Sequence, residues 1–466
     1  MTKTTYRMST MDLVLRARAM LLVAGSAAVL VSVAGCGKSS QVAPPKPKPT
    51  ASVHVAVVDG DTGAAVPRAR VTIGTQAIRS DRRGLASVSV RGPVRSVTVT
   101  APGFSARTLQ TPSGRRLVVR LYKPAAQWTV YGVTPTRVNA QAAIHVRPPF
   151  RTVWSRNLYA LLEFPAVVAD GVAYVWNGSG FLYAISMQDG SIIWRFSAGA
   201  KQQDSSPAVV GDVLVAHSKG GRVLVFDKHT GHLLWQRQVG SPIESSPVVI
   251  DGVDYFGDWG GTVYALDLRT RRLRWSYHGG CKITASASIA RGTLYIGDYC
   301  GRLLAFAAKS GKLRFSASAG SPVYGSSAIA NGRVYTPSRD SGALVAFTTS
   351  GRRLWSVPTG DYVYSAPAVW RGRVYFGSYT GWLYSVSASS GRVLWRGWVG
   401  GRISGSPTVV DGVVYAGSFA DRIVGFEART GHLLFRFPHG YYVAVAGNEG
   451  RLLLHSYSGL WAVESR

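Results

Sequence analysis

Cysteine, methionine and acidic residues are all scarce in this chain. Its 466 residues include three Cys and five Met, and 23 Asp plus Glu stand against 53 Lys plus Arg. So few cysteines, none of them adjacent, exclude a disulfide-stapled small domain and a cysteine-based zinc cluster. The deficit of acids gives a formal charge of +30. The location of that charge matters more than its sum, because a basic protein can meet nucleic acid, anionic lipid or an acidic polymer.

Glycine and aromatic residues are abundant. The chain contains 53 Gly, 13 Trp and 22 Tyr, whereas helix formers such as Glu, Gln and Met are few. No segment shows helical periodicity. The composition therefore predicts an all-β protein with many tight turns, and the length predicts more than one folded unit.

Residues 1–35 have the features of a lipoprotein signal peptide. A basic start precedes an apolar stretch from Ala19 to Val33, about the length of a signal h-region and short for a membrane span. The stretch ends in Val33-Ala34-Gly35-Cys36, the lipobox pattern, in which the Cys36 thiol takes the lipid. A plain secretory signal that happens to precede a cysteine is the alternative.

Residues 36–50 are rich in Pro and Lys and predict an extended tether between a lipid anchor and a domain. The mature protein is then expected outside the cytoplasm, anchored to the cell membrane on its outer face or in a periplasm. That location removes nucleic acid as the natural partner.

Residues 51–123 alternate apolar and polar side chains in short runs, which predicts six or seven strands. Three motifs carry a resemblance: Asp61-Thr62-Gly63, Ser80-Asp81-Arg82-Arg83-Gly84 and Ala101-Pro102-Gly103-Phe104. They are similar to the carboxypeptidase-regulatory-like (transthyretin-like) β-sandwiches. That resemblance implies a structural or adhesive module without an active site.

Positive charge is densest in this segment, which has twelve Lys or Arg and three Asp. One interpretation is a solvated surface that keeps the domain soluble. The other is attraction to anionic headgroups or a cell-wall polymer, worth about 1 kcal/mol per well-placed basic residue.

After a linker over 124–150, residues 151–466 repeat a unit of forty residues. Its marker is an aromatic residue, usually four positions after a Gly, and successive markers are 40 or 41 residues apart. The eight markers are Trp154, Trp194, Trp235, Trp275, Phe315, Trp355, Trp395 and Phe435. Such a period predicts a repeat architecture.

Each unit contains four apolar runs separated by turns. Asp170-Gly171, Asp251-Gly252, Asn331-Gly332 and Asp411-Gly412 suit two-residue hairpins. Four short strands per unit predict an eight-bladed β-propeller. The orphan strand Arg151–Arg156 is expected to complete the last blade with strands near 441–446, 451–456 and 460–463, closing the ring and leaving no open edge.

The unit resembles the PQQ-like repeat family. Ala265-Leu266-Asp267-Leu268-Arg269-Thr270 before Trp275 follows that family's pattern. The resemblance implies that each marker docks against the neighbouring blade as a core residue. The family includes quinoprotein dehydrogenases and non-catalytic BamB-like scaffold lipoproteins.

The catalytic branch implies adjacent cysteines, a calcium held by Glu and Asn, and a catalytic Asp. Here no cysteines are adjacent, the spacing leaves no room for insertions, and no set of residues suggests a calcium cage. We therefore expect no enzyme, no metal site and no cofactor. A PQQ- and calcium-dependent dehydrogenase is the alternative.

Cys281 and Cys300 fall in two loops of one blade that emerge on the same propeller face. A disulfide that braces this blade is predicted, consistent with the oxidising side of a membrane. Two free thiols are the alternative.

Aromatic residues recur in loops of the same face. They are Trp259, Tyr299, Tyr324, Tyr362, Tyr364, Tyr379 and Phe419. Exposed aromatic side chains are typical anchors of binding surfaces, although they would also recur simply because the blade does. The sequence thus predicts a monomeric scaffold that binds an envelope protein or an acidic or polysaccharide polymer through this face.

Overall fold

The structure is a computed structural model that describes residues 50–91, 93–110, 115–199 and 203–466. The predicted signal peptide, Cys36 and nearly all of the tether lie outside the described residues. Within these ranges the regular structure is β-sheet apart from one short 3₁₀ turn, η1 (Pro124–Ala126). No described helix has the length and apolar character needed to cross a membrane.

The first seven strands form two sheets around one core. One sheet has the order β4-β1-β7 and the other β3-β2-β5-β6. Alternate residues such as Val53, Val55 and Val57 point into a shared valine-rich cluster, as the period-two pattern requires. The strands are β1 (Thr50–Asp59), β2 (Arg70–Ile73), β3 (Gln76–Arg79), β4 (Leu85–Arg91), β5 (Ser96–Thr100), β6 (Arg107–Gln110) and β7 (Arg116–Leu121).

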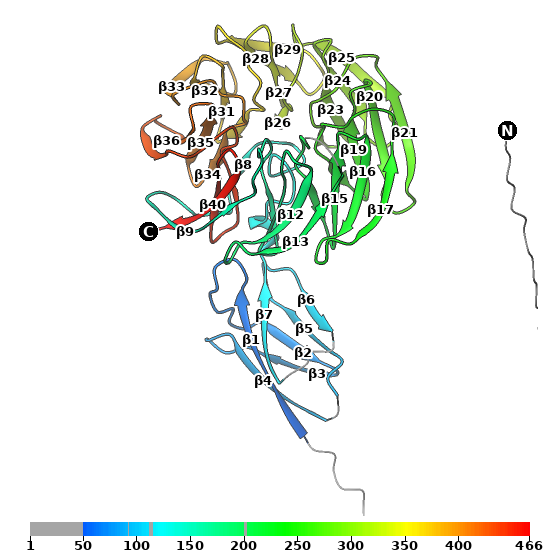
Figure 1. Cartoon of the computed structure of the whole chain (residues 1–466), viewed down its shortest axis with the longest axis vertical. Coiled ribbons are helices and arrows are strands. Elements are labelled where there is room, and N and C mark those ends of the chain that lie inside the picture. Colours follow the sequence, from blue (N-terminus) through cyan, green and yellow to red (C-terminus); the bar gives the residue numbers. More distant parts are fainter. Residues whose placement is uncertain (1–49, 92, 111–114, 200–202) are drawn as a thin grey trace, which may run out of the picture. The chain divides into compact units, whose positions relative to one another are not determined.

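The remainder forms eight sheets arranged around an axis (Figure 1), all antiparallel except for one short parallel strand in the seventh. The first four, each built from consecutive strands, are β10 (Val167–Ala169), β11 (Val172–Trp176), β12 (Phe181–Ser186) and β13 (Ile192–Ser197); β14 (Ala208–Val210), β15 (Val213–Ser218), β16 (Arg222–Asp227) and β17 (Leu233–Gln238); β18 (Val248–Ile250), β19 (Val253–Gly257), β20 (Thr262–Asp267) and β21 (Arg272–His278); and β22 (Ser288–Ala290), β23 (Thr293–Gly297), β24 (Arg302–Ala307) and β25 (Leu313–Ser318).

The last four sheets continue the series; the seventh gains a short strand from the linker, and the first strand of the repeat region completes the eighth. They are β26 (Ala328–Ala330), β27 (Arg333–Ser338), β28 (Ala343–Thr348) and β29 (Arg353–Pro358); β30 (Ala368–Trp370), β31 (Arg373–Gly377), β32 (Trp382–Ser387) and β33 (Val393–Trp398); β34 (Thr408–Val410), β35 (Val413–Ser418), β36 (Arg422–Glu427) and β37 (Leu433–Phe437) with β8 (Ala140–Gln141); and β38 (Val445–Gly447), β39 (Leu452–His455) and β40 (Gly459–Ser465) with β9 (Phe150–Asn157).

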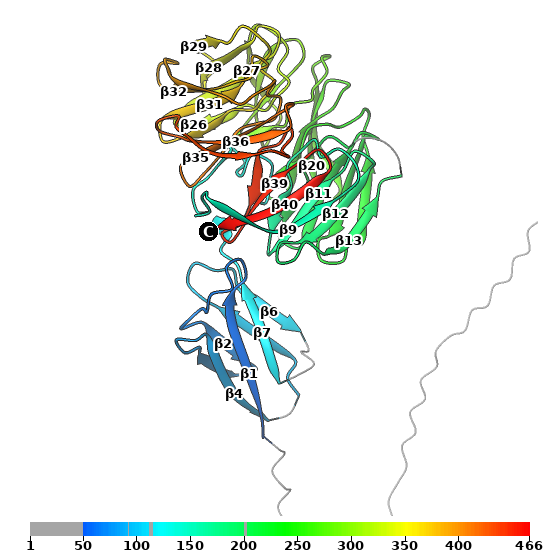
Figure 2. The ribbon, with the colours of Figure 1, turned by 60° about the vertical axis from the view of Figure 1, so that its left-hand side comes forward.

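The two ends of the repeat region meet in one sheet. β9 pairs antiparallel with β40, with Trp154 opposite Ala462, and Figure 2 shows the two strands side by side. The expected partner strand at 441–446 is shorter, because β38 begins at Val445 and the preceding residues form a loop. The pairing removes the free edges that an open array of sheets would expose.

The marker aromatics fasten neighbouring sheets together. A Cβ atom on Gly190 would lie 2.6 Å from the Trp154 ring, so only glycine, here at φ +72, allows the indole to approach. The Trp154 indole nitrogen also donates to the carbonyl of Met187 in that next sheet, at 2.9 Å. Trp154 is buried, but the other seven markers are only half-buried. They act as clamps between blades rather than as full core residues, because they lie on each sheet's outermost strand.

The linker over 124–150 is an integral part of the propeller rather than a plain connector. The first strands of neighbouring sheets lie against one another around the axis, and the linker runs along their free edges. Its backbone pairs with six of them, through Trp128 with Val168, Thr129 with Val209, Pro135 with Ile289, Thr136 with Ile329, Val138 with Val369, and Asn139 with Val409. The linker therefore satisfies edge groups that would otherwise need water.

Arg137 fixes the middle of the linker. Its side chain is fully buried and donates to the carbonyls of Ala287, Ser246 and Pro247 at 3.0 to 3.1 Å, and also to that of Tyr131. Burial lowers the pKa of the guanidinium to about 10, so it stays charged at neutral pH. One side chain thus ties the linker to two blades.

We expect Arg137→Met to lower the free energy of unfolding by at least about 3 kcal/mol, because it leaves several buried carbonyls without a donor. Urea denaturation followed by Trp fluorescence measures this. Arg436→Met, at an exposed position on β37, is the control and should change stability by less than about 0.5 kcal/mol. Equal midpoints for the two variants would contradict a structural role for the linker.

Hydrogen bonds at forty-residue intervals join the blades near the axis. The backbone N–H groups of Ser206, Ser246 and Ser286 each donate to the Oγ of the serine forty residues later, at 2.8 to 3.0 Å. Where the first and last sheets meet, the N–H of Ala166 instead donates to the Nε2 of His455, at 3.1 Å. Burial lowers the pKa of His455 to about 3.

This histidine makes the propeller sensitive to acid. Its pKa rises from about 3 in the folded chain to the ordinary value of 6.5 on unfolding. The contribution of the neutral imidazole to the free energy of unfolding is therefore complete above pH 6.5 and is lost as the pH falls toward 3. The difference corresponds to about 5 kcal/mol. We expect His455→Gln, whose amide oxygen can accept the same bond, to flatten this part of the stability–pH profile. Exposed His432→Gln is the control; an unchanged profile in His455→Gln would contradict the assignment.

Candidate functional site

In five successive blades, two loops are held together on one face of the propeller. The loop between the second and third strands donates a backbone N–H to a carbonyl seventeen residues earlier, in the loop that enters the first strand. The pairs are Trp259 with Pro242, Tyr299 with Lys282, Arg339 with Pro322, Tyr379 with Tyr362, and Phe419 with Arg402, at 2.9 to 3.0 Å. The forty-residue repeat therefore delivers side chains from five blades to one surface.

All seven predicted aromatic residues lie in one connected arc on this surface. Ring centroids 4.8 to 6.3 Å apart link Tyr299 with Tyr324, Tyr324 with Tyr364, Tyr364 with Tyr379, Tyr362 with Tyr379, and Tyr379 with Phe419. Trp259 joins through Lys282, whose Nζ lies 3.5 Å from the Trp259 ring centre and 5.1 Å from that of Tyr299. The structure thus brings the predicted residues together.

Three tyrosines that the sequence did not single out extend the arc. Tyr441 and Tyr442 contact Phe419 at 5.6 and 4.6 Å, and Tyr457 contacts Tyr441 at 5.3 Å. They belong to the eighth sheet, where the strand and loop lengths depart from the repeat. Counting in steps of forty would have found Tyr442, which lies eighty residues after Tyr362, but not Tyr457.

Basic side chains lie among the aromatic rings. Lys219 and Arg339 stand at the repeat positions before Trp259 and before Tyr379, and their charged ends lie 5.5 Å from Trp259 and 5.3 Å from Tyr299. Arg402 lies over Tyr379 at 5.7 Å. A cation over an aromatic face is attracted to the ring electrons. Extending the forty-residue count would have revealed Lys219 and Arg339. We call the whole surface, from Lys219 through Tyr457, the rim.

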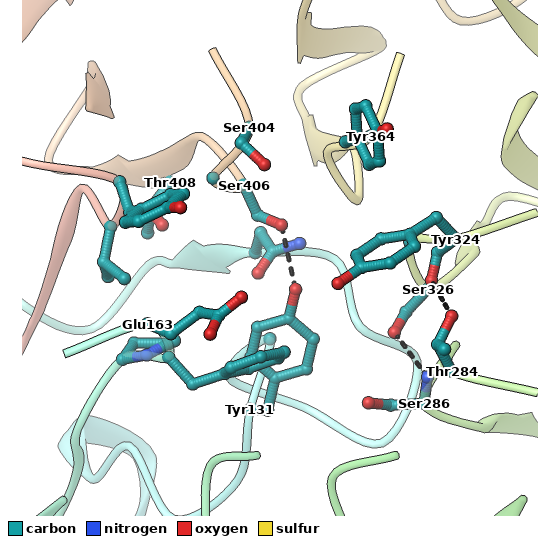
Figure 3. A pocket seen from close by; sticks show the side chains of 18 of the residues that line it. Tyr131, Glu163, Thr284, Ser286, Tyr324, Ser326, Tyr364, Ser404, Ser406 and Thr408 are labelled. Atoms are coloured by element: carbon teal, nitrogen blue, oxygen red, sulfur yellow. Dashed lines mark hydrogen bonds between the residues drawn. The ribbon is translucent and has the colours of Figure 1, made fainter. Parts of the chain in front are cut away.

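Inside the rim lies a pocket of about 70 Å³ on the propeller axis, with room for about five water molecules (Figure 3). Linker residues, including Trp128, Tyr131 and Asn139, form part of its wall. The wall also contains Glu163, Glu244, Thr284, Ser286, Tyr324, Ser326, Tyr364, Ser404, Ser406, Thr408 and Tyr442. We call it the axial pocket.

Glu244 connects the pocket to the rim. Its buried carboxylate accepts from the Tyr324 hydroxyl at 2.6 Å and from the Trp259 indole nitrogen at 3.0 Å. Burial raises the pKa of this carboxyl. Tyr324 and Trp259 were predicted as surface anchors, but here their polar atoms serve a buried carboxylate, which fixes both rings.

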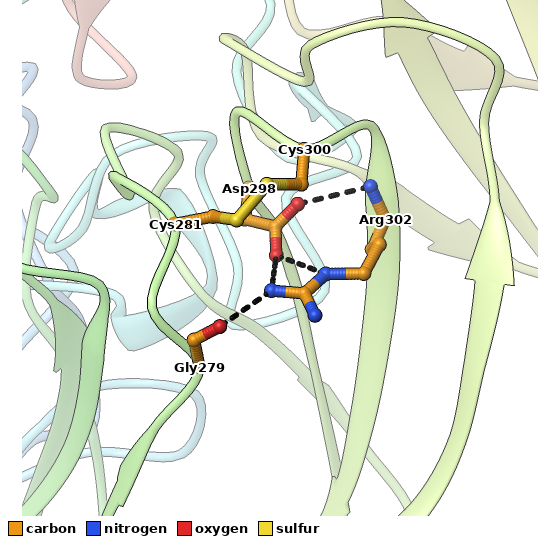
Figure 4. The surroundings of a disulfide bond; sticks show 5 residues. All are labelled: Gly279, Cys281, Asp298, Cys300 and Arg302. Atoms are coloured by element: carbon orange, nitrogen blue, oxygen red, sulfur yellow. Dashed lines mark hydrogen bonds and ion pairs between the residues drawn. A yellow bond between two sulfur atoms is a disulfide. The ribbon is translucent and has the colours of Figure 1, made fainter.

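Cys281 and Cys300 are joined by a disulfide in the fourth sheet (Figure 4). Beneath it, Asp298 accepts from the Arg302 Nε at 2.7 Å, and Arg302 also donates to the Gly279 carbonyl at 2.8 Å. The bridge joins the two rim loops of this blade. The cysteines are nineteen residues apart in sequence, which is compatible with a brace and unlike a pair of adjacent redox cysteines.

Within the described ranges, no group of three or more His, Cys, Asp or Glu side chains is placed to bind a metal ion. The buried pair His217 and Asp254 is 2.8 Å apart, and His217 also contacts the Ser245 carbonyl at 2.6 Å. Both residues are fully buried between blades. This pair is therefore part of the packing and is closed to a substrate.

The repeats match the family model described as outer membrane protein assembly factor BamB, over residues 147–280, 260–363 and 341–453. The chain belongs to this family. Two curated BamB proteins are similar over 89 residues, that of Yersinia pestis at 34% identity and that of Salmonella typhimurium at 30%. Each alignment spans 17% of this chain and only 23% of the relative.

Solved structures share the fold at low identity. BamB from Moraxella catarrhalis aligns with a TM-score of 0.57 at 17% identity, covering 68% of this chain and 99% of that one. Quinohemoprotein alcohol dehydrogenase from Comamonas testosteroni aligns with a TM-score of 0.62 at 14% identity, covering 73% and 80%. The BamB family fold is therefore shared by an assembly factor and an oxidoreductase, so the site must decide between them.

Proposed function

We propose that this BamB-family chain is a non-catalytic scaffold, an eight-bladed propeller that docks an envelope protein through its rim. The connected arc of aromatic rings and cations is the observation that carries the proposal. Tyr, Trp and Arg are the residues that contribute most binding energy at protein interfaces. Backbone bonds between paired loops support the arc, so little conformational entropy is lost on docking.

We further propose that lipidated Cys36 and the tether hold the chain on the outer face of a membrane or in a periplasm, with the seven-stranded N-terminal module, a carboxypeptidase-regulatory-like sandwich, next to it. The excess of basic residues in that module favours an anionic membrane or polymer surface nearby. Binding of an envelope polysaccharide is the second candidate, since aromatic faces also stack on sugars.

A photoreactive phenylalanine derivative at position 362 tests the docking face in cells of the native host. Tyr362 is 42% exposed on the rim, and Ile192 is 43% exposed on the outer strand β13 of another blade. We expect discrete protein crosslinks from position 362 and none from position 192. The same products from both positions, or only carbohydrate adducts from position 362, would overturn the protein scaffold proposal.

The residues present do not fit a quinone with calcium. The axial pocket, at about 70 Å³, is small for a tricyclic quinone, and the disulfide joins distant rather than adjacent cysteines. Of the acids that line the pocket, Glu244 is already engaged by Tyr324 and Trp259. No reaction step is therefore assigned to this chain.

We expect the full chain, in detergent micelles, to show no saturable change in Trp fluorescence when PQQ and calcium are added together. The dehydrogenase alternative requires saturation together with reduction of a dye by alcohols or sugars. Calcium alone and PQQ alone are the controls for inner-filter and ionic effects. Saturable binding with turnover would replace the scaffold proposal.

A further inference from the structure

Each propeller sheet has two turns at the end opposite the rim. One joins the first strand to the second, and the other joins the third strand to the fourth. Because antiparallel strands alternate in direction, both turns lie at the other end of the sheet from the rim loops. The second turn donates a backbone N–H to a carbonyl of the first. In the fourth, fifth and sixth sheets these bonds join Ala308 with Gly292, Thr349 with Gly332, and Ala388 with Gly372, at 2.9 to 3.2 Å.

Exposed cations stand on these turns in the same three sheets, and no acid accompanies them. Residues 281–398, all of which the structure describes, contain three acids, Asp298, Asp340 and Asp361, and each lies in a rim loop. The exposed cations of the opposite turns are Arg291, Lys309, Lys312, Arg352, Arg353, Arg371 and Arg392. No described carboxylate forms an ion pair with any of them. We call this surface the basic face.

The equivalent turns of other sheets carry acids, so the fold itself does not require cations here. The hairpin between the first two strands has Asp170, Asp251 and Asp411 in the first, third and seventh sheets, but Arg291, Asn331 and Arg371 in the fourth to sixth. The third strand ends in Asp227, Asp267 and Glu427 in the second, third and seventh sheets, but in Ala307, Thr348 and Ser387 in the fourth to sixth. Acids are thus missing at two repeated positions of the same three blades.

Two of the arginines hold a backbone conformation that arginine rarely adopts. Arg291 and Arg371 have φ values of 46° and 45°, in the left-handed region, where Asn, Asp and Gly are enriched. The equivalent residue of the fifth sheet is Asn331, with φ 49°. Asparagine fits this turn better than arginine does. The arginines therefore contribute something other than stability of the turn, and their charge is what distinguishes them from asparagine.

Apolar side chains directly follow two of the cations. Leu313 follows Lys312 and is 36% exposed, and Val393 follows Arg392 and is 46% exposed. The interface of a bilayer accommodates both kinds of side chain, because head groups attract the cations and the acyl boundary takes the apolar atoms. A soluble polyanion gains only from the charge. The mixture on these turns therefore favours an anionic bilayer over a soluble acidic polymer.

We propose that the basic face lies against an anionic lipid bilayer, with the phosphate groups of the lipids as its ligands and the rim turned away from the membrane. A well-placed Lys or Arg strengthens binding to such a surface about fivefold. The choice of a bilayer rests on the proposed Cys36 anchor, which keeps the chain at a membrane. Attraction of the face to anionic lipid does not need the anchor, and it does not depend on what the rim docks.

Vesicle binding tests the face on the full chain carrying Cys36→Ser, so that no acyl chain contributes. Phosphatidylcholine vesicles with about 30% phosphatidylglycerol are compared with pure phosphatidylcholine vesicles by co-sedimentation at about 0.1 M salt. We expect binding to the anionic vesicles to be at least about tenfold tighter. The neutral vesicles report any contribution of the apolar segment 19–33. Equal binding to both kinds of vesicle would overturn the proposal.

Variants separate the basic face from the basic N-terminal module. Arg291→Asn combined with Arg371→Asn removes two charges and gives both turns a residue that they favour. We expect this pair to weaken binding to anionic vesicles about tenfold without lowering the melting temperature. Arg195→Gln combined with Arg436→Gln removes the same charge from exposed positions on the outer strands β13 and β37, and should weaken binding less than about twofold. Equal losses in the two pairs, or no loss in the first, would contradict the proposal.

Lys309→Gln combined with Lys312→Gln repeats the test if the first pair melts at a lower temperature. Tighter binding of soluble polyphosphate than of anionic vesicles at equal phosphate concentration would show a polyanion site in place of a membrane contact, and would overturn the bilayer proposal. Mass spectrometry of the mature chain tests lipidation of Cys36 separately, so a missing anchor and a face that does not bind lipid are distinguishable.

A fluorophore on an introduced cysteine shows which face touches the bilayer. Ser310→Cys places it on the basic face, beside Lys309, and Tyr362→Cys places it on the rim; both positions are exposed. We expect nitroxide-labelled lipids in the anionic vesicles to quench the fluorophore at position 310 and not the one at position 362. Equal quenching at both positions, or quenching at position 362 alone, would overturn the proposed orientation.

Discussion

The free backbone edge at the centre of a ring of sheets is the constraint on which the rest of this structure depends. Each first strand presents N–H and C=O groups toward the axis, and buried groups of this kind must be paired. Here the linker pairs with six of these edges, and Arg137 serves the carbonyls between two of them. Pairing the edges from within also places linker residues such as Trp128, Tyr131 and Asn139 in the wall of the axial pocket.

The same repeat that builds the blades composes the binding face. A step of forty residues places the same loop position of successive blades side by side, so the side chains at that position become neighbours around the rim. In this chain the position is occupied in turn by Lys219, Trp259, Tyr299, Arg339, Tyr379 and Phe419. A cation therefore stands before each pair of rings in this order, and Lys219 and Arg339 each lie over a neighbouring aromatic face.

The blades and the rim loops could be predicted from the sequence, because features that recur every forty residues can be located by their spacing. The Gly–aromatic spacing predicted the order of the strands. Gly190 lies where only the absence of a Cβ atom lets the Trp154 ring approach. The loop aromatics were found for the same reason. The role of the linker was not predicted, because the linker itself carries no repeat. One of its side chains, Arg137, reaches residues 109 to 150 positions away.

The axial pocket escaped prediction for a related reason. Its wall combines the linker, the loop at Glu163 and one to four residues from each of several other blades, so no local motif marks it. The half-buried state of the Trp clamps was also missed, because a marker on an outer strand meets its neighbour with one face only. Sequence periodicity thus predicts the blades and loops that repeat, but it does not predict the pocket that they surround.

Net charge, read over the whole chain, suggests anionic partners, whereas the enclosed site is acidic. The two statements agree once exposed charges are considered separately from buried charges. Exposed basic side chains are solvated and act at long range, whereas a carboxylate such as Glu244 is buried only because Tyr324 and Trp259 donate to it. The rim and the axial pocket therefore differ in kind: the rim is an open face of aromatic rings and cations, and the pocket is a small polar volume on the axis. Tyr324 belongs to both, since its ring lies in the aromatic arc and its hydroxyl donates to Glu244 in the pocket wall.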